Sequence, residues 1–382
     1  MSSRGFKQTV FDLAARAFWA VPGRFALARM FGPSYGLRCV VFHNISETES
    51  PFTKGMNVTI TPQRIEAALK FITRYYSPVR LQDVLTDCDG HGLPARSMLV
   101  TFDDAYASVV ESAAPLCREL GVPAVFFVNA AFLDNRRLAP DNLICYVANT
   151  MGMRTINAAA RVARGDDQPE LKALSEVFSN FFPRISLAER EVFLDALLRL
   201  AAIDEGRMAQ DSNLYLTSKQ LSALNSFNFE IGNHTYTHVH SRSLSDPDFV
   251  AQVDKNKAVL ESVAGVSVRS FSQPYGSSID VTRELARHLK NSGHRAIFLS
   301  ESVANSRHAD PFHLDRVSAR AASDDTFFFE LEILPRLRAI RNAVTRRSAA
   351  IRANPTQSRA ARESTPAVET ALRANDRSEK RA

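Results

Sequence analysis

The feature that most constrains this chain is a short apolar run that ends in two adjacent acids, S-M-L-V-T-F-D-D at residues 97–104. An apolar run of this length, bounded by polar residues, is typical of a buried strand in a parallel sheet, and it delivers Asp103 and Asp104 at the strand's C-terminal end. Two neighbouring carboxylates repel each other, so their burial together requires a bound cation or different protonation states. The run therefore predicts a metal site.

A second group of polar residues follows a later apolar run, in F-E-I-G-N-H-T-Y-T-H at residues 229–238. On a helical turn, a spacing of four residues places His234 and His238 on one face, within reach of a single ion. One carboxylate and two histidines leave coordination positions open for water and substrate, which a catalytic divalent ion needs. Zinc suits these ligands best, and cobalt, nickel and iron share the preference. Taken alone, such a histidine pair is more often a solvated helix face.

Together, T-F-D-D at residues 101–104 and H-T-Y-T-H at residues 234–238 resemble the first two motifs of the NodB homology domain of polysaccharide deacetylases, carbohydrate esterase family 4. The resemblance covers about residues 37–334 and implies an α/β fold, a distorted (β/α) barrel with its site at the C-terminal ends of the strands. It implies that Asp104 and both histidines hold the metal. It also implies that Asp103 takes a proton from the water that attacks an acetamide carbonyl.

A third motif is only partly present, in S-F-S-Q-P-Y-G-S at residues 270–277. It resembles the family's F-R-P-P-Y-G and retains Pro274, Tyr275 and Gly276. Ser272 stands where the family has an arginine that positions the base carboxylate, which is a departure from the family's pattern. Gly276 permits a tight turn, and the backbone amide of Tyr275 is a candidate donor to a developing oxyanion.

The run C-V-V-F-H-N at residues 39–44 is β-prone and ends in His43. A histidine at the C-terminal end of a core strand lies where a parallel barrel keeps its chemistry, although a polar residue there can simply begin a loop. The family's last motif, L-x-H, supplies a proton-donating histidine, and none is found near the C-terminus here. Because the first strand resembles the one that circularly permuted members place first, His43 is the candidate general acid.

The barrel is expected over residues 37–335, with one interruption of its strand and helix alternation. Residues 131–216 contain a helical stretch at about 170–182 and then S-L-A-E, which resembles a capping box that opens a helix through residue 202. They predict an inserted helical subdomain, either over the barrel mouth or facing solvent. A last strand is expected at 312–317, where Asp315 and Arg316 form either a buried ion pair or a surface pair.

The two ends of the chain differ from the barrel. Residues 1–36 include a basic amphipathic segment at 6–31, which fits a helix packed on the barrel or one lying on an anionic membrane surface. The net charge is +6, and from residue 336 onward 12 basic residues face 4 acidic ones, so the tail carries +8 and the rest 6 − 8 = −2. Residues 336–382 are expected to be disordered. Specific nucleic-acid binding by this tail is disfavoured because it lacks interleaved aromatic residues.

The cysteine spacing, the N-terminus and the length of the apolar stretches bear on the compartment of this protein. Cys39, Cys88, Cys117 and Cys145 form no C-x-x-C pair, and they are too sparse for a disulfide framework. The N-terminus does not read as a secretion signal, and the apolar stretches are too short to span a membrane. We expect a cytoplasmic protein, with peripheral contact at the inner membrane surface as a further expectation.

The resemblance implies metal-dependent hydrolysis of the N-acetyl group of an acetamido sugar, in a polysaccharide, an oligosaccharide or a glycolipid precursor. Two alternatives stay within hydrolases, an O-acetyl esterase and a deformylase of lipid-linked aminosugars. A third is a non-catalytic carbohydrate-binding protein on the same fold, which the retention of both acids and both histidines disfavours. The sequence does not indicate an oligomeric state.

Overall fold

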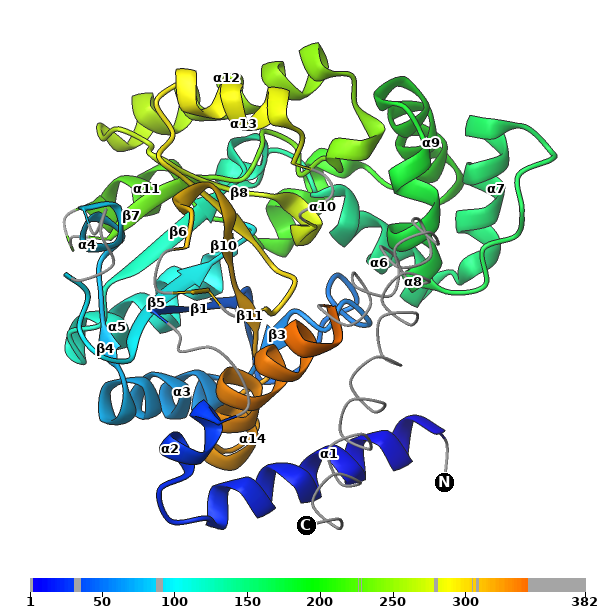
Figure 1. Ribbon diagram of the computed structural model, residues 1–382. Helices are drawn as coiled ribbons and strands as arrows, with labels where there is room; N and C mark the ends of the chain where they lie inside the picture. The colour runs from blue at the N-terminus through cyan, green and yellow to red at the C-terminus, as the bar shows by residue number, and fades with distance from the viewer. Residues whose placement is uncertain are drawn as a thin grey trace, which may run out of the picture.

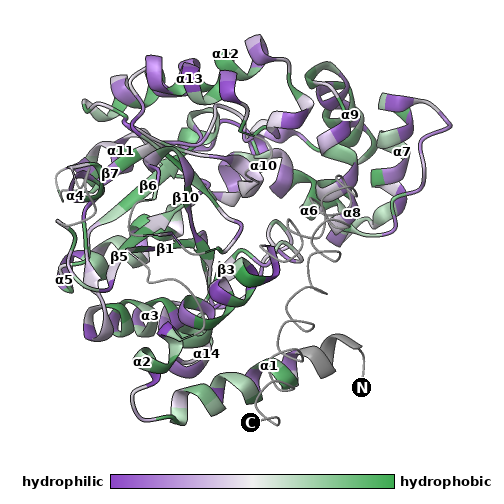
Figure 2. Ribbon diagram, viewed as in Figure 1, coloured by the Kyte–Doolittle hydropathy of each residue, from purple (hydrophilic) through white to green (hydrophobic). Residues whose placement is uncertain are grey.

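In the computed structural model, parallel strands form the wall of a barrel, helices cover its outside, and a separate group of helices lies to one side (Figure 1). The structure describes residues 3–30, 36–86, 92–225, 227, 229–277, 281–303, 305–306 and 309–342. Figure 2 shows apolar residues on the strands of the wall and alternating polar and apolar residues on the helices outside it. This pattern is expected of parallel strands that are covered on their faces.

The barrel wall is a sheet with the strand order β10-β9-β8-β7-β6-β5-β1-β11, and β4 pairs with β5. Neighbouring strands are parallel throughout. Outside the wall, β2 (Asn44–Ile45) pairs with β3 (Thr59–Ile60). The strands of the wall are β1 (Leu37–Phe42), β4 (Ser77–Pro78), β5 (Ser97–Phe102), β6 (Ala124–Val128), β7 (Glu230–Asn233), β8 (Ser270–Ser272), β9 (Ala296–Leu299), β10 (Leu314–Asp315) and β11 (Val317–Ser318).

One short segment closes the sheet into a barrel. β10 pairs with β9 and β11 pairs with β1, so residues 314–318 join the two ends of the sheet. Arg316 lies between the two strands, where its backbone N–H donates to the carbonyl of Leu299 at 3.1 Å and its carbonyl accepts from Ser302 N–H at 3.2 Å. The single strand that the sequence predicts at 312–317 is therefore two short strands, because the hydrogen-bonding neighbour changes at Arg316.

β1 and β5 lie side by side in a register that brings their ends to one level. Phe42 is opposite Phe102, and the backbone N–H of Asp103 donates to the carbonyl of Phe42 at 3.0 Å. His43 and Asp103 each follow the last residue of their strand, so both emerge at the C-terminal edge of the barrel. The strand that precedes His43 therefore lies beside the strand that precedes the acid pair.

The helices around the wall begin and end with the signals that the sequence carries. Thr61 Oγ1 accepts from the N–H of Arg64 at 3.4 Å, and Pro62 is the first residue of the helix that follows. A later helix begins after Ser245 and ends at Gly265, whose φ is 67°. These outer helices are α3 (Pro62–Tyr75), α4 (Leu81–Thr86), α5 (Ala114–Glu119), α11 (Ser218–Asn225), α12 (Asp246–Ala264), α13 (Arg283–Asn291) and α14 (Asp324–Phe328).

A group of helices fills the chain between β6 and β7 and lies beside the barrel (Figure 1). The predicted capping box is confirmed, since Ser186 Oγ accepts from Glu189 N–H at 3.2 Å and the Glu189 carboxylate accepts from Ser186 N–H at 2.7 Å. The helical stretch predicted from residue 170 begins at Leu174 instead. The helices of this insertion are α6 (Pro140–Thr150), α7 (Met153–Arg164), α8 (Leu174–Glu176), α9 (Leu187–Leu200) and α10 (Glu205–Ser212).

The N-terminal segment forms α1 (Ser3–Ala20) and α2 (Arg24–Arg29). Phe11 packs edge-on against Phe329 at 5.2 Å between ring centroids, and Trp19 lies 5.8 Å from Phe71 and from Phe328. One face of α1 is therefore packed on α3 and on the helical segment that starts with α14. Among the described residues, no helix combines the length and apolarity that crossing a membrane requires.

The predicted start of the basic tail at residue 336 is wrong. The helical segment that begins with α14 continues to residue 342, and within it Arg336 is buried and its Nη1 lies 3.1 Å from a carboxylate oxygen of Glu332. Composition does not reveal this boundary, because the charge of Arg336 is compensated by a residue one helical turn earlier. Residues 343–382, which hold the rest of the predicted tail, lie outside the described residues.

Cys39, Cys117 and Cys145 are free and buried, and Cys88 lies outside the described residues as well.

Candidate active site

A cavity of about 380 Å³ opens at the C-terminal edge of the barrel strands. Pro274 is buried in the turn just before two of the lining residues and does not line the cavity itself. A cavity of about 550 Å³ between α12 and α13 contains none of the predicted site residues. The predicted site residues that line the first cavity are His43, Asp103, Asp104, His234, His238, Tyr275 and Gly276.

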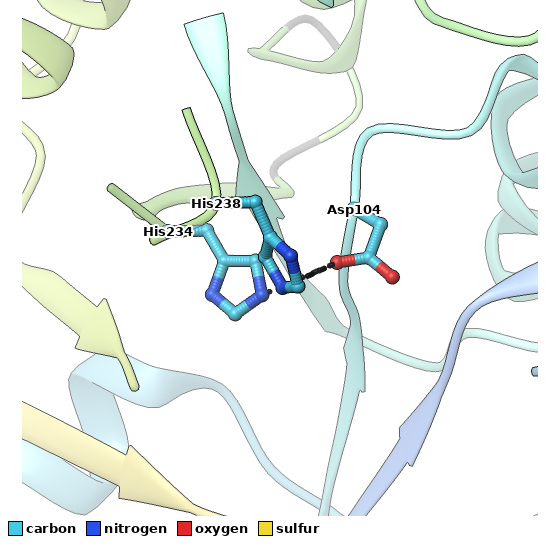
Figure 3. Close-up of side chains that lie close together, drawn as sticks. All are labelled: Asp104, His234 and His238. Carbon is cyan, nitrogen blue, oxygen red and sulfur yellow. Dashed lines mark ion pairs between the residues drawn. The ribbon is translucent and has the colours of Figure 1, made fainter. Parts of the chain in front are cut away.

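The side chains of Asp104, His234 and His238 converge on one point (Figure 3). Asp104 Oδ1 lies 3.3 Å from Nε2 of His234 and 3.5 Å from Nε2 of His238. One ligand atom from each residue lies within 4.8 Å of the other two. The acid follows β5 and the histidines follow β7, so two strand ends of the barrel supply this group.

A hydrogen bond at Nδ1 fixes the tautomer that each imidazole adopts in its neutral form. Nδ1 of His234 lies 2.9 Å from the carbonyl oxygen of Ser272, which can only accept, so Nδ1 carries the proton. Nδ1 of His238 lies 2.5 Å from a carboxylate oxygen of Asp141, which fixes the same tautomer there. Both Nε2 lone pairs then face Asp104 Oδ1, which is buried and has no hydrogen-bond partner among the described residues.

Three lone-pair atoms that face one another in a buried site repel unless a cation lies between them. Two imidazole nitrogens and one carboxylate oxygen are ligands that zinc and the neighbouring divalent metals accept, and they leave coordination positions open. The donor set of Asp104, His234 and His238 therefore fits a divalent metal ion.

The two histidines do not lie on a helical turn, contrary to the prediction. Residues 234–238 form a loop after β7, in which Thr235 has a φ of 64° and His238 a φ of 50°. Left-handed backbone costs roughly 1–3 kcal/mol for each residue other than glycine, so surrounding contacts must maintain it. Asn129, buried at the end of β6, supplies some of them: its Nδ2 donates to the carbonyls of both His234 and Thr235.

Asp103 is held by an arginine from the segment that closes the barrel. Arg316 Nη1 donates to Asp103 Oδ1 and Arg316 Nη2 donates to Asp103 Oδ2, each at 2.7 Å, and both side chains are buried. Burial alone would raise the pKa of the Asp103 carboxyl, but the Arg316 guanidinium, together with His234 and His43, outweighs this effect and lowers the pKa. The carboxylate of Asp103 is therefore ionised at neutral pH.

The same arginine accounts for the altered third motif. Arg316 Nη2 also donates to the hydroxyl of Ser272 at 2.7 Å, so the small Ser272 side chain borders the guanidinium. The sequence pairs Arg316 with Asp315, and this pairing is wrong. Asp315 instead accepts from the backbone N–H groups of Glu301 and Arg316, and burial raises its pKa to about 6.

His43 lies in the cavity with Asp103 and Asp104. Burial lowers the pKa of the His43 imidazole, and the negative charges of these two carboxylates offset part of that shift. The shared cavity places His43 beside the predicted metal ligands. The role of general acid remains a prediction.

The residues Pro274–Gly276 form a tight turn at the cavity wall. Tyr275 has a φ of 61° and Gly276 a φ of 70°, and a Cβ on Gly276 would lie 2.4 Å from Cβ of Ser300. Only glycine fits there without displacing the neighbouring strand end. The ring of Tyr275 stacks on His240 at 4.9 Å, and its hydroxyl donates to Asp141 at 2.8 Å. That the Tyr275 amide binds an oxyanion stays a prediction.

Comparison with known proteins agrees with this geometry. Residues 196–295 match the family model described as polysaccharide deacetylase, a region that contains both histidines and the Pro274–Gly276 turn. No curated protein matches the chain. The Streptococcus pyogenes deacetylase PplD in complex with acetate is similar in structure, with a TM-score of 0.52 and 12% identity over 79% of this chain and 100% of that chain.

Two further solved structures are similar over most of their length. IcaB from Ammonifex degensii has 17% identity and a TM-score of 0.48, over 75% of this chain and 93% of that chain. A de-N-acetylase from Aggregatibacter actinomycetemcomitans has 15% identity and a TM-score of 0.48, over 75% of this chain and 96% of that chain. Because PplD is only 12% identical to this chain, its likeness shows the fold alone. The predicted distorted (β/α) barrel is confirmed.

Proposed function

We propose, from the premise that this chain is a polysaccharide deacetylase of the NodB type and a hydrolase of non-peptide carbon–nitrogen bonds, that it removes the N-acetyl group of an acetamido sugar with the help of one divalent metal ion. Asp104, His234 and His238 would hold this ion. The observation that carries the proposal is the set of three lone-pair atoms that these residues turn toward one another. Zinc suits the set best, and cobalt, nickel and iron share the preference.

When bound, the metal supplies a Lewis acid that polarises the amide carbonyl and makes water easier to deprotonate. Asp103 lies beside this group and is kept ionised by Arg316, so its carboxylate accepts the proton of the attacking water. Asp103 cannot turn freely, because both of its oxygens accept from one guanidinium. The base is therefore oriented before the substrate arrives.

His43 donates a proton to the departing amine in this proposal. An amine is a poor leaving group unless it is protonated, and a positioned acid contributes about 10²-fold or more to such a step. His43 lines the same cavity as Asp103 and comes from the adjacent strand end. The backbone N–H of Tyr275, in the turn at the cavity wall, donates to the oxyanion that forms at the carbonyl.

The substrate class is an N-acetylated sugar in a polysaccharide, an oligosaccharide or a glycolipid precursor. A placed proton donor favours an amide over an O-acetyl ester, because an alcohol leaves more readily than an amine. The ionised base and the metal group together disfavour a non-catalytic carbohydrate-binding role. A lipid-linked sugar that carries a formyl group would need the same residues.

The test is hydrolysis by the purified, zinc-loaded protein. N-acetylated glucosamine oligomers and acetylated xylan are offered separately, and acetate and free amine are both measured. Release of equal amounts of acetate and amine from the oligomers supports the proposal. Acetate release from xylan alone would identify an esterase, and no release from either substrate by metal-loaded protein would contradict deacetylation of these polymers.

We also propose that α1 contacts an anionic membrane surface from the cytoplasmic side. Val10 is 50% exposed and Leu13 is 61% exposed, and with Ala17 they recur at helical spacing on the side away from the barrel. In residues 3–30, one acid, Asp12, accompanies five basic residues, which are Arg4, Lys7, Arg16, Arg24 and Arg29. Exposed apolar side chains among basic ones favour binding to anionic lipid.

A further inference from the structure

We propose that the helical insertion is part of the metal site, and that Asp141, at the start of α6, is a positioning residue that holds His238 for the metal. This inference rests on the proposed metal-dependent function. It assigns a role to the insertion, for which the sequence alone predicts only a place over the barrel mouth or a solvent-facing position. The contacts of the insertion with the loop at residues 234–238 carry the argument.

Both oxygens of the Asp141 carboxylate bond to residues of the site. Oδ2 lies 2.5 Å from Nδ1 of His238, and Oδ1 accepts from the hydroxyl of Tyr275 at 2.8 Å. The carboxylate is buried, and a buried carboxylate destabilises a fold unless its partners are well placed. One partner, His238, is a predicted metal ligand, and the other, Tyr275, lines the same cavity. Asp141 therefore contacts the site as well as the insertion.

A buried polar network fixes where α6 places this carboxylate. Pro140 is the first residue of α6, so Asp141 lies in its first turn. The next residue, Asn142, donates from Nδ2 to the hydroxyl of Tyr106 at 2.9 Å and accepts from the hydroxyl of Tyr215 at 2.6 Å. Tyr106 follows the acid pair on the barrel and Tyr215 lies at the C-terminal end of the insertion, so the start of α6 is bonded both to the barrel and to the end of the insertion.

A second contact from the insertion reaches the same loop. Arg190, on α9, is buried and donates from Nη2 to the carbonyl of Thr237 at 2.7 Å. Thr237 is the residue before His238, and its N–H and hydroxyl both bond to Gln252 of α12. Asn129 of the barrel bonds the other end of this loop, whereas the end that bears His238 is held by the insertion together with α12.

Such contacts act on the metal through the ligand. A carboxylate bonded to the far nitrogen of a metal-binding histidine fixes the tautomer and the ring orientation, and it makes the ligand nitrogen more basic. Removal of such a partner typically weakens metal binding about 10- to 100-fold. The left-handed backbone of His238 is a second reason why the loop needs such contacts, because they must maintain its strained conformation when no metal is bound.

The experiment compares full-length wild-type protein with Asp141→Asn, which preserves the shape of the side chain and removes its charge. Zn²⁺ dissociation constants are measured by competition with a chelating dye, and the visible absorption of the Co²⁺ form reports ligand geometry. We expect an increase in the dissociation constant of about 10- to 100-fold and an altered Co²⁺ spectrum. The matched control is Asp195→Asn, which removes one exposed charge from α9 and should change neither quantity.

A purely structural role predicts a different result. In that case Asp141→Asn lowers the melting temperature of the metal-free protein but leaves the Zn²⁺ dissociation constant and the Co²⁺ spectrum unchanged. This result would overturn the proposal. Where Asp141→Asn does not fold, Arg190→Met replaces it, and an unchanged dissociation constant in that variant overturns the proposal equally. Failure of the proposed function itself is distinguishable, because the wild-type protein would then bind no divalent ion.

Discussion

Arg316 donates one hydrogen bond to each carboxylate oxygen of Asp103, both at 2.7 Å, across 213 residues of sequence. The two residues come from the segment that closes the barrel and from the strand end that bears the acid pair. Because the contact is bidentate and buried, it fixes both the charge and the orientation of Asp103. Arg316, from the segment that closes the barrel, thus contacts the predicted base in place of the arginine that the third motif lacks.

Replacement of Arg316 should move the acidic limb of the pH profile. Burial raises the pKa of the Asp103 carboxyl and Arg316 is the strongest charge that lowers it, so Arg316→Met removes the main effect that opposes burial and raises that pKa. Activity that requires the ionised carboxylate is then lost at a higher pH. The measurement is kcat/KM against pH, with Arg320→Met as the control because Arg320 pairs with Glu330 instead. An acidic limb that stays in place would show that Arg316 does not set the charge of Asp103.

The same substitution should lower stability in a pH-dependent way. A carboxyl with a lowered pKa in the folded state stabilises the fold above its unfolded pKa of about 3.9, and this contribution disappears as the pH falls through the folded pKa. Breaking a buried pair on one side typically costs about 3–5 kcal/mol. Urea unfolding at neutral pH and at low pH measures both effects. The difference in the free energy of unfolding between wild type and variant should be smaller at low pH than at neutral pH.

The two adjacent acids should separate in their effects on metal and turnover. Asp104→Asn removes a ligand and should lose the metal. Asp103→Asn leaves all three proposed ligands in place, so it should retain the metal and lower kcat by roughly 10²–10⁴-fold. Metal content by elemental analysis and turnover of the same preparations are compared. Equal loss of metal in both variants would mean that Asp103 is a ligand as well.

The role of His43 depends on the leaving group. His43→Ala should lower hydrolysis of an N-acetylated sugar about 10²-fold or more, because the amine needs a proton to depart. The same variant should retain most activity toward 4-nitrophenyl acetate, whose phenolate leaves without one. Asp103→Asn serves as the comparison, since a base is needed for both substrates. A similar loss on both substrates in His43→Ala would argue against a general acid.

Membrane contact through α1 is tested by co-sedimentation with anionic vesicles at low salt. Leu13→Glu places a negative charge on the exposed apolar face and should reduce the bound fraction severalfold. The matched control is Val162→Glu, because Val162 is 54% exposed on α7 of the insertion. Absence of binding by the wild-type protein, or equal loss in both variants, would leave α1 with its packing role alone.

Local patterns were sufficient to predict the strands and the ends at which the ligands lie. The apolar run before Asp103 and the run before His43 each have the length of a core strand, and their polar ends meet because parallel strands share an edge. The caps at Thr61 and Ser186 were also predictable, since each cap is made within three residues of sequence.

Contacts that depend on distant segments could not be predicted in this way. Nothing near Arg316 in sequence indicates Asp103, and the adjacent Asp315 is the obvious but wrong partner. Asp141 was missed because the capping box of α9 was the clearest helical signal of the insertion, whereas α6 carries none of comparable clarity. The spacing of His234 and His238 was correct evidence for proximity but wrong for conformation, because a loop with left-handed residues achieves the same convergence.

The closure of the barrel by residues 314–318 sets the order in which a newly synthesised chain can complete its site. A chain that has emerged from the ribosome only as far as β9 already contains both acids and both histidines, but β1 lacks its outer neighbour and Asp103 lacks its guanidinium. Such non-local pairings form late, since the loop that joins them must first be closed. Until Arg316 arrives, Asp103 lacks the two hydrogen bonds that fix its orientation and stabilise its charge, so the site is completed only when the barrel closes.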